Sequence, residues 1–183
     1  MRADLADLIV HLARAAQSSA RTDLTAAQWT ALRYFARANR FSRTPSAFSE
    51  FHATTRGTAS QTVKSLVEIG LLARAAHEGD GRSTLIEVTE AGRAMLQNDP
   101  MEGLRSALAR LPQADQETLA TILDRARADL ARLRDVPVFG TCADCSHCDR
   151  ARDPAFCHCT GISLTLPDMA ALCVDFSPKP ART

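Results

Sequence analysis

Apolar and polar positions alternate in two successive patterns between Thr54 and Arg82. Apolar residues first recur at intervals of three and four, which predicts a helix over residues 56–69 with one inward face. The recurring positions are Val63, Leu66, Val67 and Leu71. Gly70 is placed where a helix commonly ends in a left-handed conformation. Two strand patterns, LLARAAH and STLIEV, then flank the tip EGDGR, which has the Gly and Asp of a hairpin loop. Helix, turn and two-stranded wing predict a winged helix-turn-helix.

The opposite face of this predicted helix is polar. Its side chains are short hydroxyls, an amide and long cations, the types that reach base edges and phosphates in a major groove. They are Arg56, Thr58, Ser60, Gln61 and Lys64. We therefore expect this helix to contact DNA.

Helical periodicity covers most of the rest of the chain as far as residue 134. The predicted helices span residues 3–20, 26–39, 45–52, 90–98, 101–110 and 112–134. Three of the predicted helices follow a capping threonine, at Thr25, Thr55 and Thr89, and Pro45 suits the first turn of another. The last helix would be roughly 35 Å long at 1.5 Å per residue. Because its apolar stripe is weak, we expect it to pack on the first helix and on a second subunit.

Pro137 and Gly140 mark a change in composition, after which cysteine dominates. The sequence therefore predicts two units: a winged-helix DNA-binding and dimerisation domain over residues 1–137, and a cysteine-rich tail over residues 138–183. The predicted fold class is mainly α, with a two-stranded wing, long N- and C-terminal dimerisation helices and a small cysteine-rich appendage.

Net charge and targeting signals give little further information about the function of the chain. The formal net charge is +1, but residues 37–82 hold seven Lys or Arg against four Asp or Glu, so a modest basic excess coincides with the predicted DNA-contacting segment. No signal peptide and no apolar run of about 18 residues is present in the sequence. We expect a cytoplasmic protein without membrane contact, in which structural disulfides are rare.

Three segments resemble the MarR-type regulators: LTAAQWTALRYF, TTRGTASQTVKSLVEIGLLAR and GDGRSTLIEVTEAG. The resemblance covers roughly residues 1–134, and its most specific part is the ordered set of helix, GLL strand and Asp80-x-Arg82 wing. It implies a homodimer joined by its first and last helices. It also implies recognition helices in successive major grooves of a palindromic double-stranded operator, with Arg82 in the minor groove.

On this interpretation, Arg43, Arg56 and Lys64 contact phosphates. The side chains expected at base edges are Thr55, Thr58, Ser60 and Gln61. The alternative is that Arg56 and Lys64 are ordinary solvated residues, and that Asp80 and Arg82 form only a salt bridge within the hairpin.

All six cysteines lie in the tail with the spacing C-x2-C-x2-C-x8-C-x-C-x13-C. Such clustering in a reducing compartment indicates metal ligation or thiol chemistry. We favour an iron–sulfur cluster, either 4Fe-4S or 2Fe-2S, over a zinc ion, and either over redox disulfides within Cys157–Cys159 or the C-x2-C pairs. The expected ligands are Cys142, Cys145, Cys157 and Cys173. Cys148 and Cys159 are either substitutes or bystanders, and His147 and His158 could also act as ligands, although six thiols make them unnecessary.

The leading hypothesis is a dimeric, sequence-specific regulator, most simply a repressor and not an enzyme, that senses redox state, oxygen or iron through its tail. We expect the tail to act on the long helix, which ends about eight residues before Cys142. An alternative is a MarR-like regulator of a small organic ligand with a zinc-stapled tail, in which Trp29, Tyr34 and Phe35 line the ligand pocket.

A third hypothesis, an iron–sulfur electron carrier or enzyme, is disfavoured. The sequence shows no nucleotide-binding glycine loop, no Ser/His/Asp set and no C-x3-C-x2-C motif.

Overall fold

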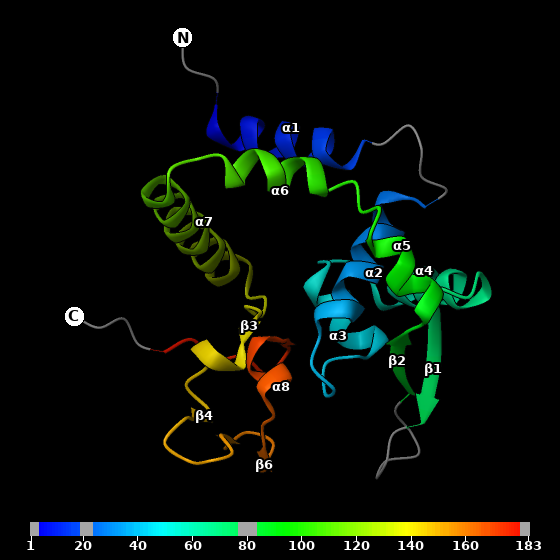
Figure 1. The fold of residues 1–183 in the computed structure, drawn as a ribbon, viewed down its shortest axis with the longest axis vertical. Coiled ribbons are helices and arrows are strands. Elements are labelled where there is room, and N and C mark those ends of the chain that lie inside the picture. Colours follow the sequence, from blue (N-terminus) through cyan, green and yellow to red (C-terminus); the bar gives the residue numbers. More distant parts are fainter. Residues whose placement is uncertain (1–3, 19–23, 77–83, 180–183) are drawn as a thin grey trace.

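The computed structural model describes residues 4–18, 24–76 and 84–179. Three helices form the upper part of the molecule, a winged helix-turn-helix lies to one side below them, and the cysteine-rich tail lies below the longest helix on the other side (Figure 1). The upper helices are α1 (Leu5–Gln17), α6 (Glu102–Ala109) and α7 (Gln113–Arg134). The winged helix comprises α2 (Ala26–Arg37), α3 (Pro45–Phe51), α4 (Arg56–Glu68), β1 (Leu72–Ala76), β2 (Thr84–Val88) and α5 (Glu90–Leu96). This confirms the predicted mainly helical fold with a two-stranded antiparallel wing.

Threonine hydroxyls begin the helices of the winged helix, as the sequence predicts. Thr25 forms a capping box with Gln28 at the start of α2, and Thr55 and Thr89 cap α4 and α5. Each hydroxyl accepts a backbone N–H that the first turn of the helix leaves without a partner. Because of these caps, the predicted starts of the three helices agree with the structure.

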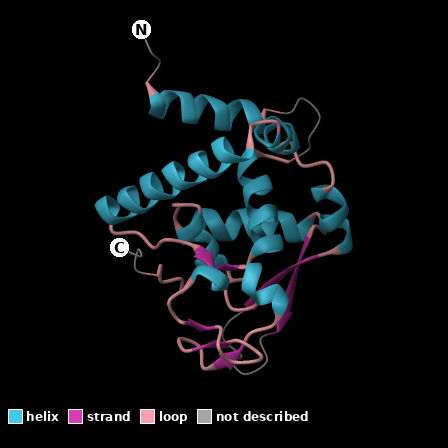
Figure 2. Cartoon of the chain, turned by 60° about the vertical axis from the view of Figure 1, so that its left-hand side comes forward, coloured by secondary structure: helices cyan, strands magenta, loops and turns pink. Residues whose placement is uncertain are grey.

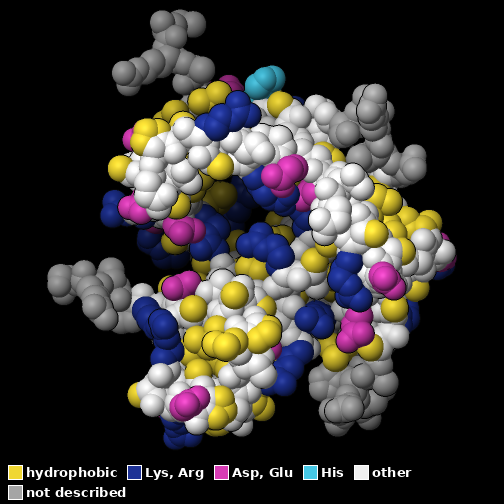
Figure 3. Space-filling model, in the orientation of Figure 1, with side chains coloured by type: hydrophobic (Ala, Val, Ile, Leu, Met, Phe, Trp, Pro, Cys, Tyr) yellow, Lys and Arg dark blue, Asp and Glu magenta, His cyan; other side chains and the backbone are white. Residues whose placement is uncertain are grey.

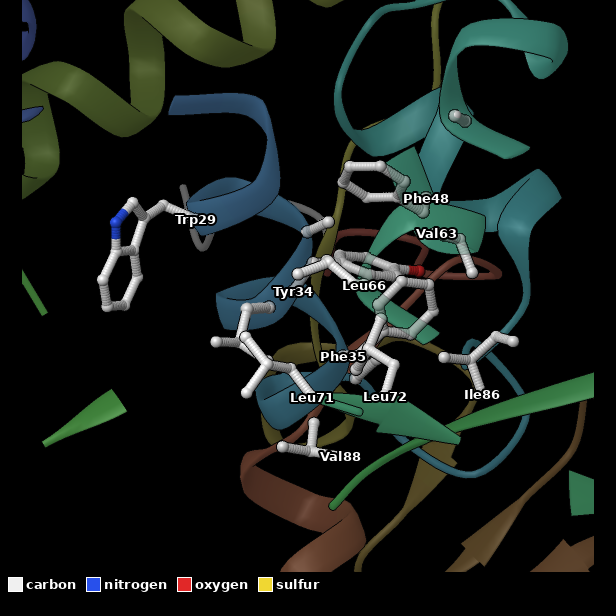
Figure 4. Packing of buried hydrophobic residues seen from close by; sticks show 14 of the residues in the cluster. Trp29, Tyr34, Phe35, Phe48, Val63, Leu66, Leu71, Leu72, Ile86 and Val88 are labelled. Atoms are coloured by element: carbon white, nitrogen blue, oxygen red, sulfur yellow. The ribbon is translucent and has the colours of Figure 1, made fainter. Parts of the chain in front are cut away.

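The core of the winged helix is built around the aromatic side chains of α2 and α3 (Figure 4). Trp29, Tyr34 and Phe35 are at most 2% exposed, so these three residues belong to the core. Phe48 packs against Tyr34 and Phe35, with ring centroids 5.5 and 5.7 Å away. Val63 and Leu66 of α4 and Ile86 of β2 complete this core, which holds the inward face of α4 in place.

Two glycines fix the junction between α4, the wing and α5. Gly70 has φ of 76°, the left-handed conformation that the sequence predicts for the end of α4. At Gly92 a Cβ atom would lie 2.2 Å from the Leu71 carbonyl oxygen, so only glycine fits there. The Thr89 hydroxyl donates to the Gly70 carbonyl oxygen at 2.7 Å and accepts the Gly92 N–H at 3.0 Å. The direction of the wing is therefore tied to the end of α4.

The upper helices expose a large apolar surface. In α1 no residue is buried, and Leu5, Leu8 and Ile9 are 75%, 51% and 50% exposed. In α7, Leu133 is 84% exposed. Hydrophobic side chains lie along the upper rim of the molecule, where α1 runs (Figure 3). Within the described residues, no helix has the length and apolarity needed to cross a membrane.

A buried carboxylate joins the winged helix to the upper helices. Asp99 is 5% exposed, and its two oxygens accept hydrogen bonds from Arg33 of α2 at 2.7 Å and Arg105 of α6 at 2.6 Å. Burial acts to raise the pKa of Asp99. The Met101 N–H and the two guanidinium groups outweigh it and hold the pKa below its usual value.

We expect Asp99→Asn to lower the free energy of unfolding at pH 7 by about 3 kcal/mol, because it removes the charge that pairs two guanidinium groups. The folded-state pKa lies below the unfolded value of about 3.9. This stabilisation is therefore present above about pH 4, and it is lost as the pH falls through the folded-state pKa. Urea unfolding at pH 7 and pH 3 measures both effects. Glu102→Gln is the control, because Glu102 pairs with the same Arg105 at 3.2 Å but is exposed.

The tail is a small lobe of short strands. Two antiparallel sheets, β3–β7 and β4–β5–β6, are joined by short helical turns (Figure 2). The elements are β3 (Gly140–Thr141), η1 (Cys142–Asp144), β4 (Cys148–Asp149), β5 (Phe156–Cys157), β6 (Ile162–Ser163), α8 (Leu166–Ala170) and β7 (Leu172–Cys173). Phe139 is buried in the winged-helix core, and Leu172 and Val174 pack against it. The tail is thus docked on the first domain.

Candidate nucleic-acid interface and cysteine centre

The outward face of α4 carries the predicted DNA-contacting side chains. The buried residues of this helix are Ala59, Val63 and Leu66. The side chains of α4 that are predicted to contact DNA are all exposed: Arg56, Thr58, Ser60, Gln61 and Lys64. The polarity of the helix faces is therefore as predicted, whereas the contacts of each residue with DNA stay predictions.

Two of the hydroxyls predicted to contact bases also bond to each other. Thr55 Oγ1 accepts the Thr58 N–H at 3.2 Å and lies 2.9 Å from Thr58 Oγ1. Ser60 and Gln61 lie farther along α4, beyond this cap. Lys64 Nζ is 3.7 Å from Glu68, and an exposed pair of this kind is weak enough to release the ammonium to a phosphate.

Arg43 and Arg82 are predicted to contact DNA from outside α4 and its cap. Arg43 is half-buried in the segment between α2 and α3, where its Nε donates to the Ala38 carbonyl oxygen at 3.1 Å. It therefore has a structural contact that the sequence did not predict. Asp80 and Arg82 of the wing tip lie outside the described residues.

Arg74 is a cation near α4 that sequence analysis missed. It is exposed on β1 and, together with Ser60 and Thr84, lines a groove of about 330 Å³. The sequence shows Arg74 only as a cation within the first predicted wing strand. Because a side chain in a strand can face either side, that signal did not place it beside α4.

Four of the six cysteines are buried in the tail. Cys142, Cys145, Cys157 and Cys173 are 4%, 5%, 8% and 6% exposed, whereas Cys148 is half-buried and Cys159 is exposed. These four are the ligands that the sequence predicts. All six thiols are free.

Backbone turns and strand pairs position the segments that carry the cysteines. The Cys145 N–H donates to the Cys142 carbonyl oxygen, and the Cys148 N–H donates to that of Cys145, so two tight turns follow each other. Cys148 lies opposite Cys157 in the β4–β5 pair, and Cys173 lies opposite Gly140 in the β3–β7 pair. The Ser177 N–H is 3.5 Å from Cys145 Sγ.

The Cys142 and Cys173 side chains interact, and their interaction shifts the two pKa values in opposite directions. The interaction with Cys142 holds the pKa of Cys173 below its usual value, although burial acts to raise it. The interaction with Cys173 and burial both raise the pKa of Cys142. Of the two thiols, Cys173 therefore loses its proton more readily, and a thiolate is the form that binds metals.

The number of buried thiols matches a thiolate-bound metal group, whereas their arrangement does not. Four buried sulfurs meet the ligand count of a zinc ion or an iron–sulfur cluster. The buried Thr160 hydroxyl, three residues after Cys157, has no hydrogen-bond partner within the described residues. In the same part of the chain, no three His, Cys, Asp or Glu side chains converge as ligands of one ion. Metal binding would therefore need thiol side chains to rotate.

The tail contacts the segment between α2 and α3, residues 38–44, which we call the α2–α3 link. The Asn39 N–H donates to the Leu172 carbonyl oxygen at 2.8 Å, and the Val174 N–H donates to Ser42 Oγ at 2.9 Å. Arg127 of α7 donates to the Phe139 carbonyl oxygen. The expected contact with α7 is thus present, but the sequence did not predict the contact with the link.

A family model and several solved structures match the winged-helix part of this chain. The model of the MarR family matches residues 22–83. A probable transcriptional regulator from Pseudomonas aeruginosa is 30% identical, with a TM-score of 0.52 over 67% of this chain and 92% of that one. The transcriptional regulator SlyA (22% identity, TM-score 0.57) and the MepR–DNA complex of S. aureus (21%, 0.55) share the fold. They match 70% and 69% of this chain, and 95% of each of those chains. No curated protein matches.

Proposed function

The chain belongs to the MarR family of DNA-binding transcriptional regulators, and from this premise we propose that it is a homodimeric repressor controlled by an iron–sulfur cluster in its tail. The observation that carries the proposal is the burial of four thiols in a tail that is docked on the α2–α3 link. In this proposal α4 contacts a palindromic operator, and the tail sets the position of the DNA-binding elements.

The residues proposed to hold the cluster are Cys142, Cys145, Cys157 and Cys173. A bound cluster would supply a covalent staple whose integrity depends on redox state, oxygen and iron. A lobe of this size with few large apolar residues needs such a staple to keep a fixed structure. Within the chain, β7 carries both Cys173 and the Leu172 carbonyl that bonds to Asn39, so ordering the cysteines also orders the contact with the link.

The proposal is tested with anaerobically purified protein. Iron, acid-labile sulfide, zinc and visible absorbance are measured first. Affinity for a palindromic duplex, selected by the protein from a random library, is then measured before and after chelation. Iron and sulfide in equal amounts, with a change in affinity on chelation, support the proposal. A colourless protein with about one zinc per chain would overturn the sensing function.

A second candidate, a MarR-like regulator of a small organic ligand with a structural zinc tail, is favoured by one cavity. It has a volume of about 590 Å³ and lies between α3 and the end of α7. Phe51, Leu130 and Phe139 supply apolar walls, and Arg127 and Arg134 line it as well. The zinc result above, with an affinity for DNA that chelation does not change, would support this candidate.

Substitutions on α4 should separate phosphate contacts from base contacts. We expect Lys64→Ala to weaken binding to all sequences and to reduce the slope of log affinity against log salt by about one. Gln61→Ala should leave the slope unchanged and weaken operator binding by about 1–3 kcal/mol. Titrations from low to moderate salt measure both. Arg132→Ala on α7 is the charge-matched control, and an equal loss of slope in that variant would contradict the assignment.

A further inference from the structure

Asp99 lies in the segment that connects α5 of the winged helix to α6 of the upper helices (Figure 1). Its Oδ1 accepts from Arg33 of α2 at 2.7 Å and from the Met101 N–H at 3.0 Å, and its Oδ2 accepts from Arg105 of α6 at 2.6 Å. Within the described residues, no other side chain hydrogen-bonds to a helix on each side of this connection. We call Asp99 with its two arginines the α2–α6 joint.

On the winged-helix side, the joint is fixed to the DNA-contacting helix. Arg33 belongs to α2, and its neighbour Leu32 shares the buried core with Leu66 of α4. Gln28, also on α2, donates to Ser65 Oγ of α4 at 3.1 Å. A close-packed core transmits a displacement because it has no room to absorb one. We therefore expect α2 and α4 to move together, so that the position of Arg33 determines the position of α4.

On the other side, the joint is fixed to the upper helices. Arg105 lies within α6, and the Glu102 N–H at the start of that helix donates to the Asp99 carbonyl oxygen at 3.0 Å. A short turn then leads to α7, which with α1 carries the exposed apolar side chains expected at the subunit interface. The carboxylate thus connects α4, through α2, with the part of the chain that would hold a second subunit.

We propose that Asp99 is a specificity-determining residue, which sets the spacing of the two half-sites that the dimer binds. This inference rests on the dimeric, DNA-binding part of the function proposed above and does not depend on the metal. In a dimer joined by its upper helices, the distance between the two α4 helices depends on how each winged helix is held on those helices. The joint holds it there in both protomers.

The physical basis is the geometry of the duplex. Each additional base pair between half-sites moves one of them by about 3.4 Å along the axis and about 35° around it. Both α4 helices can reach a mis-spaced pair of half-sites only if a winged helix turns relative to the upper helices. Two buried hydrogen bonds from guanidinium groups to a carboxylate, each roughly twice as strong as a neutral bond, resist that turn. A rigid joint therefore penalises the wrong spacing, which is how specificity arises from a difference of affinities.

The other polar contacts of the upper helices do not have this role. Glu102 pairs with Arg105 at 3.2 Å, but both residues belong to α6. Arg127 of α7 donates to the Phe139 carbonyl oxygen, which belongs to the tail. Asp99 is singled out because it is buried and bonds to a helix on each side.

The test compares Asp99→Asn, Arg105→Ala and the control Glu102→Gln in the full-length protein. Asp99→Asn removes the charge that both guanidinium groups share. Arg105→Ala releases α6 alone and leaves Asp99 its bonds to Arg33 and Met101, so it carries the test if the asparagine variant does not fold. Glu102→Gln removes only an exposed pair with the same arginine. Light scattering and urea unfolding show which variants are folded dimers under the assay conditions.

Affinity is measured for three kinds of duplex: the one that the wild type selects from a random library, the same duplex with two base pairs inserted between its half-sites, and a single half-site. In the wild type, the insertion should lower affinity at least about 50-fold, within the range of typical coupling between sites. In Asp99→Asn and Arg105→Ala this loss should shrink at least about fivefold. Their affinity for the single half-site should stay within about twofold of the wild type, because α4 is far enough away for its contacts to be independent. Glu102→Gln should keep the whole loss.

The outcomes distinguish the two proposals. A monomeric wild type overturns the proposed dimeric function and this inference with it. A dimeric wild type that binds both spacings equally overturns the role of Asp99 alone, as do folded variants that are as strict as the wild type or that lose affinity for the single half-site. A smaller loss on insertion in the folded joint variants, with the single half-site and Glu102→Gln unchanged, supports the inference.

Discussion

Replacement of Cys173 by alanine is expected to abolish metal binding and to give a protein with the DNA affinity of the chelated wild type. Cys173 is 6% exposed and lies in β7, between the Leu172 carbonyl that accepts from Asn39 and the Val174 N–H that donates to Ser42. Removing its sulfur takes away one of four buried ligands and leaves the lobe without its staple. Loss of one partner of a closed thiolate site couples directly to the folding of so small a unit.

The measurement is metal per chain after anaerobic purification, followed by DNA affinity. Cys159→Ala is the matched control, since Cys159 lies in the same tail but is exposed. This variant should keep wild-type metal content and affinity. If Cys159→Ala lost the metal while Cys173→Ala kept it, the proposed ligand set would be wrong.

We expect Cys148→Ala to have a metal content between those of Cys173→Ala and Cys159→Ala, so this variant is a weaker test of the ligand set. Its sulfur is half-buried and lies 3.8 Å from Met169 Sδ. It also lies opposite Cys157 in the β4–β5 pair, close enough to replace a lost ligand after a side-chain rotation. The contrast between Cys173 and Cys159 is therefore the sharper comparison.

Local patterns in the sequence predicted most of the winged helix. Thr25, Thr55 and Thr89 cap helices through bonds to residues only three positions away, so their role is visible in a short window. The inward face of α4 follows in the same way from the helical period of Val63 and Leu66. Among the cysteines, spacing predicts only that Cys142 and Cys145 share a turn, whereas Cys173 is predicted as a ligand because it is distal and Cys157 because it follows an aromatic residue in a loop.

Contacts between distant parts of the chain could not be predicted in this way. Asn39 and Leu172 are bonded across more than 130 residues, and nothing in either segment indicates the other. Asn39 was indistinguishable from a loop asparagine at the end of a helix. For the same reason Arg43 was assigned to phosphate alone, since its bond to the Ala38 carbonyl depends on how the link folds back.

The docked tail also explains why the α2–α3 link is polar and yet buried. Asn39 and Ser42 are 2% and 0% exposed, and burial of such groups is tolerated only when they are hydrogen-bonded. Both use the tail for part of this bonding, through Leu172 and Val174. Without the tail these groups would meet water or lose partners, so the winged helix of this chain is adapted to its appendage.

Replacement of Ile9 by aspartate is expected to convert a dimer into a monomer and to weaken operator binding at least about 100-fold. Ile9 belongs to the apolar stripe of α1, where Leu5, Leu8 and Ile9 are all at least half exposed in the single chain. A charge placed in a buried interface lacks a partner and opposes association. A monomer also loses the second recognition helix, which an operator with two half-sites binds at little additional entropic cost.

Light scattering gives the mass in solution, and titration with the selected duplex gives the affinity. His11→Asp introduces the same charge on the polar side of α1, where His11 is exposed, and should remain dimeric with nearly unchanged affinity. The two variants differ only in which face of the helix carries the new carboxylate. An Ile9→Asp protein that kept the mass of a dimer would show that α1 does not form the subunit interface, and the exposed stripe of α7, including Leu133, would then be the surface to test.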